Sequence, residues 1–372
     1  SFRPIFYHMK DFNFGLELPL NSVSFGQVSF ALLREFYKKG LTPSLFAFQD
    51  KVDYSSQSNI DKEFLQWISE CRRKAAMSHD RKWPIFKLWH LAGSMQSYSE
   101  KQVLMSFYEL DEPTEYELNI ARNNRTIFTS SYSQEVFKSK GVDTEFVPLG
   151  FDEGNFYETG RDYFSNRITF NVVGKFEKRK HHSRIITSWI DKYGNNPDYF
   201  LQCSIDNPFF KPEQNQEIKK SLLGGNNIFN IQFMEFFPLN SLYNDFLNSA
   251  DIVIGMSGGE GWGLPEFHSV ALGKHSVILN ASSYKDWAND KNSTLVYPCG
   301  KWPAEDGVFF KKGAVTNQGN IYTFSEEEFI EACDQAIERV KSNKVNLEGK
   351  KLRQEFTYTK TCDKILEILQ SI

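Results

Sequence analysis

An alternation of apolar runs with segments of helical periodicity constrains the fold of this chain more than any other feature. In the first half, apolar runs predict strands at Pro4–Met9, 41–48, 85–92, 102–110, 126–131 and 144–150. Helices are predicted at Gly26–Lys39 and Asp61–Met77, and a polar loop with Gly and Asn is expected between the first strand and the first helix. This order is typical of a parallel sheet flanked by helices, in which ligands bind beyond the carboxyl ends of the strands.

A polar stretch at 151–166 interrupts the alternation, and we interpret it as a linker. A second series follows, with strands expected at 167–176, 198–205, 250–257 and 275–280. Helices are expected at Ser183–Tyr193, Pro265–Gly273, Glu326–Val340 and Thr359–Ile372. Because 372 residues exceed the usual length of one domain, we expect two αβα domains, at 1–155 and 156–355, and a C-terminal helix at about 356–372 that packs back onto the first.

Charge and composition limit the partners of the chain. The 43 Lys and Arg against 47 Asp and Glu give a net charge of -4, so we expect no global attraction to nucleic acid or anionic lipid, and any anion site is local. Five cysteines without a C-x-x-C pair favour reduced thiols and a cytoplasmic protein, with peripheral membrane contact left open. The aromatic share of 15% is interpreted as core packing, with sugar-stacking surfaces as the alternative.

A glycine-rich turn at 257–263 follows a predicted buried strand and directly precedes a predicted helix. Such a turn lets backbone N–H groups approach an anion, and the positive end of the helix dipole favours negative charge. The turn is therefore a candidate diphosphate site, although a tight connection without a ligand has the same pattern.

A cluster of cations, Lys175, Lys178, Arg179 and Lys180, follows another predicted strand of the same series. Cations at a strand end can neutralise a departing phosphate. A solvated charge run is the alternative. Because both features fall at the ligand-binding edge of one predicted sheet, the functional interpretation is favoured.

These motifs resemble those of retaining GT-B glycosyltransferases of the large glycogen-synthase-like family (glycosyltransferase family 4 type). That family carries a G-R-L-x-x-x-K segment and an E-G-F-G-L-P-x-x-E-A-x-A-x-G segment, which read GKFEKRK at 174–180 and EGWGLPEFHSVALG at 260–273. The segment SSYSQEVFKSKGVDTEFVPLGFD at 130–152 is similar to a third family motif. The resemblance covers roughly residues 100–285 and implies two Rossmann-like domains with parallel sheets that face an interdomain cleft.

The resemblance also implies roles for residues of the second half. Lys175 and Lys180 match the pair that grips the donor diphosphate, and Glu260 matches the acid that holds sugar hydroxyls. The donor-binding positions beside them are Gly174, Gly261, Trp262, Gly263 and Leu264. The family's second Glu, which binds the ribose, is His268 in this chain, and Glu266 lies nearby. An imidazole can still exchange hydrogen bonds with a hydroxyl.

The first half resembles the family at fewer positions. Glu109 stands at the strand end where relatives place a His or Glu that faces the donor sugar, with a surface carboxylate as the alternative. Gly26, followed by Gln27, resembles the acceptor-side loop that touches the diphosphate. His90 is either a cleft residue or a structural histidine. The basic segment at 71–82 either meets an anionic acceptor or membrane, or forms a solvated helix face, which we favour.

The implied reaction is transfer of a sugar from a nucleotide-diphosphate sugar, UDP- or GDP-linked, to an acceptor hydroxyl with retention of configuration. The chain contains no Asp-x-Asp triplet, so fixed cations are expected in place of a metal, and no cofactor is expected. The acceptor is a glycan, a lipid-linked sugar or a small molecule. A nucleotide-sugar hydrolase or epimerase and a non-catalytic sugar-nucleotide or glycan-binding module remain as alternatives, whereas nucleic acid is disfavoured by the net charge.

Overall fold

The computed structural model describes residues 11–372, so the strand expected at Pro4–Met9 lies outside the described residues. The chain divides into two compact units. Unit 1 comprises the residues up to Tyr108, together with Thr114–Asn155 and Phe356–Ile372. Unit 2 comprises Glu109–Pro113 and Phe156–Glu355. Each unit contains a parallel six-stranded sheet with helices packed against it, so the predicted α/β class is confirmed.

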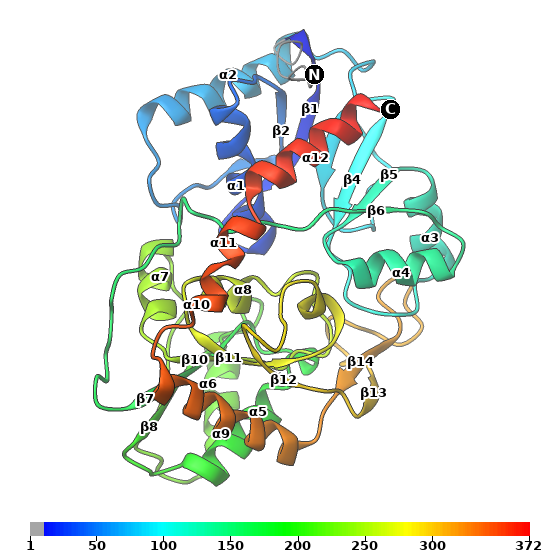
Figure 1. The fold of residues 1–372 in the computed structure, drawn as a ribbon. Helices are drawn as coiled ribbons and strands as arrows, with labels where there is room; N and C mark the ends of the chain where they lie inside the picture. The colour runs from blue at the N-terminus through cyan, green and yellow to red at the C-terminus, as the bar shows by residue number, and fades with distance from the viewer. Residues whose placement is uncertain (1–10) are drawn as a thin grey trace. The chain divides into compact units, whose positions relative to one another are not determined.

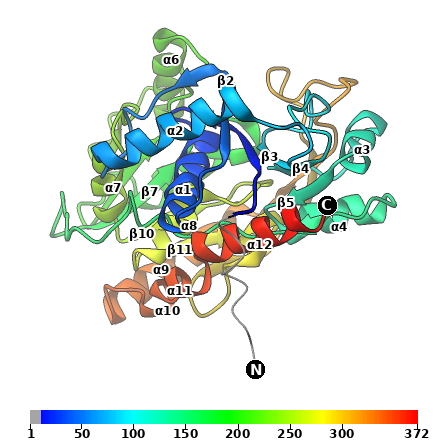
Figure 2. The same cartoon turned by 90° about the horizontal axis from the view of Figure 1, so that it is seen from above.

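The sheet of unit 1 has the strand order β2-β1-β3-β4-β5-β6, and every pair is parallel. Its strands are β1 (Gly15–Leu20), β2 (Ser44–Val52), β3 (Ile85–Leu88), β4 (Gln102–Ser106), β5 (Arg125–Phe128) and β6 (Glu145–Phe146). Its helices are α1 (Ser24–Lys38), α2 (Lys62–Ser78), α3 (Glu115–Arg122), α4 (Ser131–Ser139) and α12 (Tyr358–Gln370). Helix α12 packs against α1, as Figures 1 and 2 show from two directions.

Strand β1 corrects the sequence prediction, because it lies where a polar loop was expected. It occupies a central place in the sheet between β2 and β3. Leu16, Leu18 and Leu20 are buried, as a strand with alternating apolar residues requires. Gly15, Glu17 and Pro19 separate them, and all three types are depleted in strands, which hid the pattern.

Helix ends in unit 1 follow ordinary capping chemistry. The Asp61 carboxylate accepts a hydrogen bond from Phe64 N at the start of α2, and Thr114 forms a capping box with Glu117 at the start of α3. The hydroxyl of Thr361 in α12 donates to the carbonyl of Pro148 at 2.8 Å. Helices α3 and α4 were not predicted, although the capping box was a readable signal.

The sheet of unit 2 has the order β12-β11-β10-β7-β8-β9, again with every pair parallel. Its strands are β7 (Ile168–Val173), β8 (Tyr199–Ser204), β9 (Ile231–Phe233), β10 (Ile252–Gly255), β11 (His275–Leu279) and β12 (Thr294–Val296), and an antiparallel hairpin pairs β13 (Gly300–Pro303) with β14 (Asn320–Thr323). Its helices are α5 (His182–Tyr193), α6 (Pro212–Leu223), α7 (Asn240–Asn248), α8 (Leu264–Ala271), α9 (Glu326–Ser342), α10 (Leu347–Lys350) and α11 (Leu352–Glu355), with short 3-10 segments η2 (Lys178–Lys180) and η3 (Ser282–Asp286). The β9 and β12–β14 strands and helices α6, α7, α10 and α11 were not predicted.

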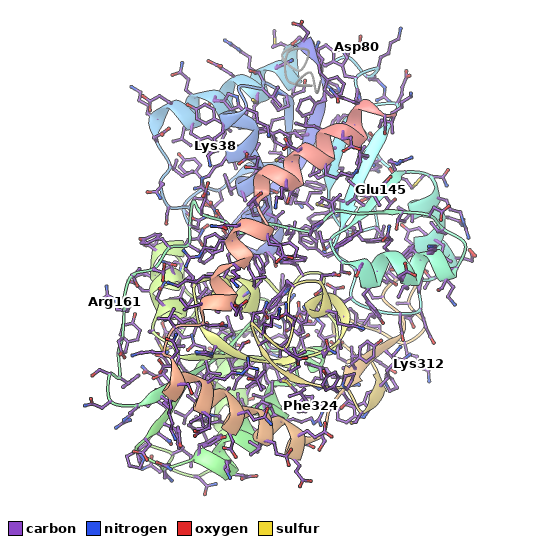
Figure 3. All side chains as sticks on the ribbon, in the orientation of Figure 1. Lys38, Asp80, Glu145, Arg161, Lys312 and Phe324 are labelled. Carbon is purple, nitrogen blue, oxygen red and sulfur yellow. The ribbon has the colours of Figure 1, made fainter. Side chains whose placement is uncertain are left out.

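The core of unit 2 lies between the sheet and the helices α5 and α9. Trp189 of α5 and Phe170 of β7 are fully buried and meet edge to face, with ring centroids 5.9 Å apart. Phe324, labelled in Figure 3, is also buried, and the Arg184 guanidinium lies 4.1 Å from its ring centroid. None of the helices within residues 11–372 is long and apolar enough to cross a membrane.

Candidate active site

The glycine-rich turn of unit 2 connects β10 to α8, and two of its glycines are required by close contacts. A Cβ on Gly258 would lie 2.3 Å from the carbonyl oxygen of Tyr322. Gly263 has a φ of +82°, and its Cβ would lie 2.5 Å from the ring of Tyr284. Larger residues would therefore force the turn away from its neighbours, so these glycines set its path.

The cation segment follows β7 and brings its side chains to the same turn. Gly174 has a φ of +112°, and a Cβ there would lie 3.1 Å from the Lys180 ammonium, so the glycine gives Lys180 room. The Lys180 ammonium donates to Glu260 Oε1 at 2.6 Å. The Arg179 guanidinium lies 2.9 Å from the same Glu260 oxygen and donates to the carbonyl of Gly259 at 2.7 Å. Two cations thus share one carboxylate.

These groups are buried and electrostatically coupled. Arg179, Lys180 and Glu260 are each 7–8% exposed. Burial disfavours the charged form of Glu260, but Arg179 and Lys180 outweigh it and hold the pKa of that carboxyl well below its ordinary range. Glu260 is therefore ionised at neutral pH, and its backbone is fixed by Ser282, whose hydroxyl accepts from Glu260 N at 3.2 Å.

A second buried acid, Glu177, supports the cations from the other side. Its Oε2 accepts from Arg179 Nε at 2.8 Å, and its Oε1 lies 2.8 Å from the Lys175 ammonium. Lys175 also lies over two aromatic rings, 4.8 Å from the Phe309 centroid and 5.1 Å from that of Phe209. Lys175 therefore belongs to the same charged network, and its ammonium keeps an aromatic environment that favours a cation.

Glu109 belongs to the five-residue segment of unit 2 and lies beside the turn. A Cβ on Gly259 would contact the Glu109 carbonyl at 2.7 Å. Asp111 anchors the segment, since its carboxylate accepts from Asn320 N at 2.7 Å and pairs with the Lys301 ammonium at 2.7 Å. Burial raises the pKa of Glu109 to about 7, Arg179 opposes this shift, and Glu260 adds to it. Glu109 can therefore carry a proton near neutral pH.

Helix α8 carries the remaining acidic and imidazole groups. Glu266 is 2% exposed; burial raises the pKa of its carboxyl, Lys180 opposes the shift, and Tyr284 interacts with it. The His268 ring lies 4.2 Å from the ring of Phe156, and its Nδ1 is 2.8 Å from the carbonyl of Leu264. His268 is thus covered by an aromatic ring, with one nitrogen used by the helix backbone.

Solved structures resemble this chain over nearly its whole length. Sucrose-phosphate synthase from Thermosynechococcus elongatus matches with a TM-score of 0.65 at 13% identity, over 97% of this chain and 98% of that one. HepE from Anabaena in complex with UDP-glucose matches with a TM-score of 0.64 at 14% identity, over 97% and 100%. WaaG, a glycosyltransferase involved in lipopolysaccharide biosynthesis, matches with a TM-score of 0.60 at 11% identity, over 97% and 100%. The chain has the GT-B fold.

At these identities the likeness establishes the fold alone. No protein-family model matches the sequence, and a search of curated proteins finds no significant match. The GT-B fold expected from the motifs is therefore confirmed by structure rather than by sequence comparison.

Among the predicted donor-binding positions, Trp262 differs from the others because its side chain is buried in the core. Gly174, Gly261, Gly263 and Leu264 lie on the segments that carry Lys180 and Glu260. Trp262 is 2% exposed, and its carbonyl accepts from Trp287 Nε1 at 3.0 Å, so its indole is part of the core.

The residues predicted from the first half lie in unit 1, except for Glu109. Gly26 is in the first turn of α1, where a Cβ would lie 1.9 Å from the carbonyl of Asn21, so a close backbone approach requires glycine. His90 follows β3 and meets the ring of Phe25 with centroids 4.7 Å apart. In the basic segment, Lys74 donates to Asn13 Oδ1 and to the carbonyl of Thr42, each at 2.8 Å, which is a structural role.

Sequence reasoning missed Glu177 and Asp111 as members of the site, and it placed Arg179 in the cation cluster without assigning it a partner. Arg179 and Glu177 stand inside the motif GKFEKRK at positions where the family pattern places no fixed residue, so the resemblance passed over them. In that segment Glu177 stands among the cations Lys175, Lys178, Arg179 and Lys180. This mixture of opposite charges was the signal from which an ion-pair network could have been predicted. Within residues 11–372, no group of three or more His, Cys, Asp or Glu side chains is arranged to hold a metal ion.

Proposed function

We propose that this protein is a glycosyltransferase that moves a sugar from a nucleotide-diphosphate donor to an acceptor hydroxyl, with retention of configuration and without a metal. The observation that carries the proposal is the Glu260 carboxylate, bound by Lys180 and Arg179 at the glycine-rich turn before α8. The solved complexes of HepE with UDP-glucose, with UDP and glucose, and with UDP support a nucleotide-sugar donor for this fold.

In the proposed reaction, fixed cations do the work of charge neutralisation. Lys180 and Lys175 bind the donor diphosphate, and the positive end of the α8 dipole adds to their field. Arg179 stays with Glu260 when Lys180 turns to the phosphate, so the carboxylate keeps a counter-ion. Glu260 then accepts hydrogen bonds from hydroxyls of the donor sugar.

The chemical step breaks the bond between the anomeric carbon and the diphosphate oxygen and forms one to the acceptor oxygen. The acceptor hydroxyl proton passes to the departing diphosphate, so no enzyme nucleophile is required. In this proposal Glu109, the pKa of which burial raises to about 7, exchanges a hydrogen bond with the donor sugar in either protonation state. Preorganised charges of this kind stabilise the transition state because they need no rearrangement as charge develops.

The test combines donor binding with turnover. A cognate donor at about 100 times its Kd should add about 2.7 kcal/mol to the free energy of unfolding, so thermal shifts against UDP-, GDP-, ADP- and TDP-sugars identify it. Lys180→Ala and Glu260→Gln should abolish acceptor-dependent release of the nucleoside diphosphate while circular dichroism stays unchanged. Lys341→Ala, on the exposed face of α9, is the matched control. Wild-type turnover in either site variant would overturn the proposal.

A non-catalytic nucleotide-sugar-binding module is the second candidate, and His268 favours it. Its Nδ1 is used by the helix backbone and its ring is covered by Phe156, so the position offers less to a ribose than a carboxylate would. Donor binding without turnover across an acceptor panel would support the module. Release of free sugar without an acceptor would instead support a hydrolase.

A further inference from the structure

A cavity of about 350 Å³ lies in unit 2 beside the β13–β14 hairpin, and we call it the hairpin cavity. Its apolar wall comes from the segments after β7 and β8 and from the hairpin itself. The side chains of this wall are Phe176, Phe210, Trp302, Val308 and Phe309. Neither Lys175, Lys180 nor Glu260 lines the cavity, so it is distinct from the candidate active site.

The wall of the hairpin cavity is aromatic but is not part of the hydrophobic core. Phe176, Phe210 and Phe309 are half-buried, and Trp302 is 41% exposed. Rings in the core of this unit, such as that of Phe170, are fully buried. Aromatic walls with a few polar groups are typical of ligand pockets, and the volume of the cavity lies at the small end of their range. The cavity therefore has the size and the lining of a site for a small molecule.

Neighbouring groups hold this wall in place without a ligand. The Arg184 guanidinium lies 4.5 Å from the Trp302 ring centroid and donates to Glu326 Oε1 at 2.7 Å. The Asp306 carboxylate closes the loop between β13 and β14, because its Oδ1 accepts from the three backbone N–H groups of residues 308–310 at 2.8 to 2.9 Å. The wall is thus preorganised, which lowers the entropy cost of binding.

Charged groups of both signs reach the hairpin cavity. Among the residues that the structure describes, the lining contains the cations Lys178 and Arg184 and the acids Glu177 and Asp306. The Lys178 ammonium donates to two backbone carbonyls of the hairpin at 2.7 and 2.8 Å, which leaves one of its three N–H groups for a ligand. The second oxygen of Asp306, Oδ2, takes no part in the contacts that close the loop.

The groups around these four do not favour one sign of charge in a ligand. Glu177 is already paired with Lys175 and Arg179. His181 also lines the cavity, but burial lowers the pKa of its imidazole to about 4, so it is neutral at neutral pH. The two lysines at 311–312 are exposed and do not line the cavity. An anion would therefore meet an acid in the cavity, and a cation would meet two bases.

We propose that the hairpin cavity binds a neutral sugar unit of a glycan, as a second sugar site apart from the donor site. The C–H face of a pyranose ring packs against an aromatic face such as that of Trp302, whose quadrupole is negative. Hydroxyls both donate and accept, so one sugar can donate to Asp306 Oδ2 and accept from Lys178 Nζ. The inference goes beyond the proposed function and does not depend on it, because the cavity contains none of the residues assigned to the donor.

NMR spectroscopy of the indole N–H groups reports binding at Trp302 directly. The chain has seven Trp residues, and the signal of Trp302 is the one that Trp302→Phe lacks. Maltose and cellobiose are the neutral probes, glucose 6-phosphate and glucosamine are the charged ones, and uridine tests a planar base. We expect the neutral sugars to shift the Trp302 signal. In calorimetric titrations, Trp302→Ala should weaken their binding roughly ten-fold, and Trp302→Phe should restore most of the affinity.

Asp306→Asn changes one polar contact and keeps the loop closed. The Asn Oδ1 can still accept from residues 308–310, whereas an amide N–H₂ group takes the place of Oδ2. We expect neutral sugars to bind Asp306→Asn more weakly than wild type, and glucose 6-phosphate to bind it more tightly. Phe229→Ala, which removes an exposed ring that does not line the cavity, should leave every affinity unchanged.

Several outcomes would overturn the inference. They are the absence of neutral-sugar binding, binding that leaves the Trp302 signal unshifted, a preference of wild type for a charged sugar or uridine, and equal affinities in wild type and Trp302→Ala. A nucleotide sugar that shifts the Trp302 signal more than maltose does would assign the cavity to the donor and also overturn it. A chain that binds neutral sugars at Trp302 but binds no nucleotide sugar contradicts the proposed function alone.

Discussion

Replacing Arg179 with Met tests whether the buried charge network holds unit 2 together. The guanidinium contacts Gly259 O, Glu177 Oε2 and Glu260 Oε1 at 2.7, 2.8 and 2.9 Å. Removing one member of a buried ion pair costs about 3–5 kcal/mol, because the partner charge is left uncompensated. Lys180 and Lys175 still face the two acids, so we expect a loss near the low end, about 3 kcal/mol, in Arg179→Met.

Urea unfolding at neutral pH, followed by tryptophan fluorescence, measures this loss. Because the cations lower the folded-state pKa values of Glu177 and Glu260, the stability they confer is present above the ordinary carboxyl pKa and is lost as the pH falls through the folded values. The difference in the free energy of unfolding between wild type and Arg179→Met should therefore decrease as the pH falls below about 4.3.

Two controls decide the outcome. Arg179→Lys keeps the charge without the planar guanidinium group. Its free energy of unfolding should lie between those of wild type and Arg179→Met. Lys341→Met removes an exposed cation of α9 and should leave the unfolding midpoint unchanged. The reasoning is refuted if Arg179→Met costs no more than Lys341→Met, or if the gap between wild type and Arg179→Met widens in acid.

Two further changes probe single groups of the site. Burial raises the pKa of Glu109 in the folded state to about 7, so the folded state binds this proton more tightly than the unfolded state does. The free energy of unfolding should therefore fall as the pH rises from the ordinary carboxyl value towards 7. Glu109→Gln should lack this fall when its urea unfolding midpoints at acidic and neutral pH are compared with those of wild type. At Gly263 the φ is +82°, and the Cβ of Gly263→Ala would lie 2.5 Å from the Tyr284 ring. At Gly160 the φ is +65°, but no atom lies within 4 Å of an added Cβ. Gly263→Ala should therefore lower the melting temperature more than Gly160→Ala.

The alternating architecture could be predicted from the sequence because most strands are continuous apolar runs followed by amphipathic helices. Strand β10 and helix α8 fell within two residues of the expected bounds. Strand β1 escaped because Glu17 and Pro19 interrupt its leucines, and the half-buried Glu17 pairs with Lys87 on the neighbouring strand at 3.4 Å. That partner is 70 positions away, so no local pattern reveals it.

The candidate site shows the same division between local and distant information. Glycine spacing and the cation run marked the turn and Lys180, since both are local patterns. The pairing of Arg179 with Glu260 joins residues about 80 positions apart, and Asp111 reaches Asn320 over 209. The aromatic excess was interpreted as core packing, which holds for rings such as Phe30 and Phe170. Rings such as Phe25 and Trp89 are only half-buried, and composition carries no information on exposure.

The place of α12 in unit 1 has a consequence for how the chain is made. Its buried face, with Cys362, Ile365 and Leu369, covers α1, although all of unit 2 is synthesised between the two helices. At roughly 5–20 residues per second, a ribosome needs on the order of tens of seconds for that stretch. During this interval the surface of α1 that α12 will cover stays open. The first unit to emerge is therefore the last to be completed, and slow translation of unit 2 should increase its demand for chaperones.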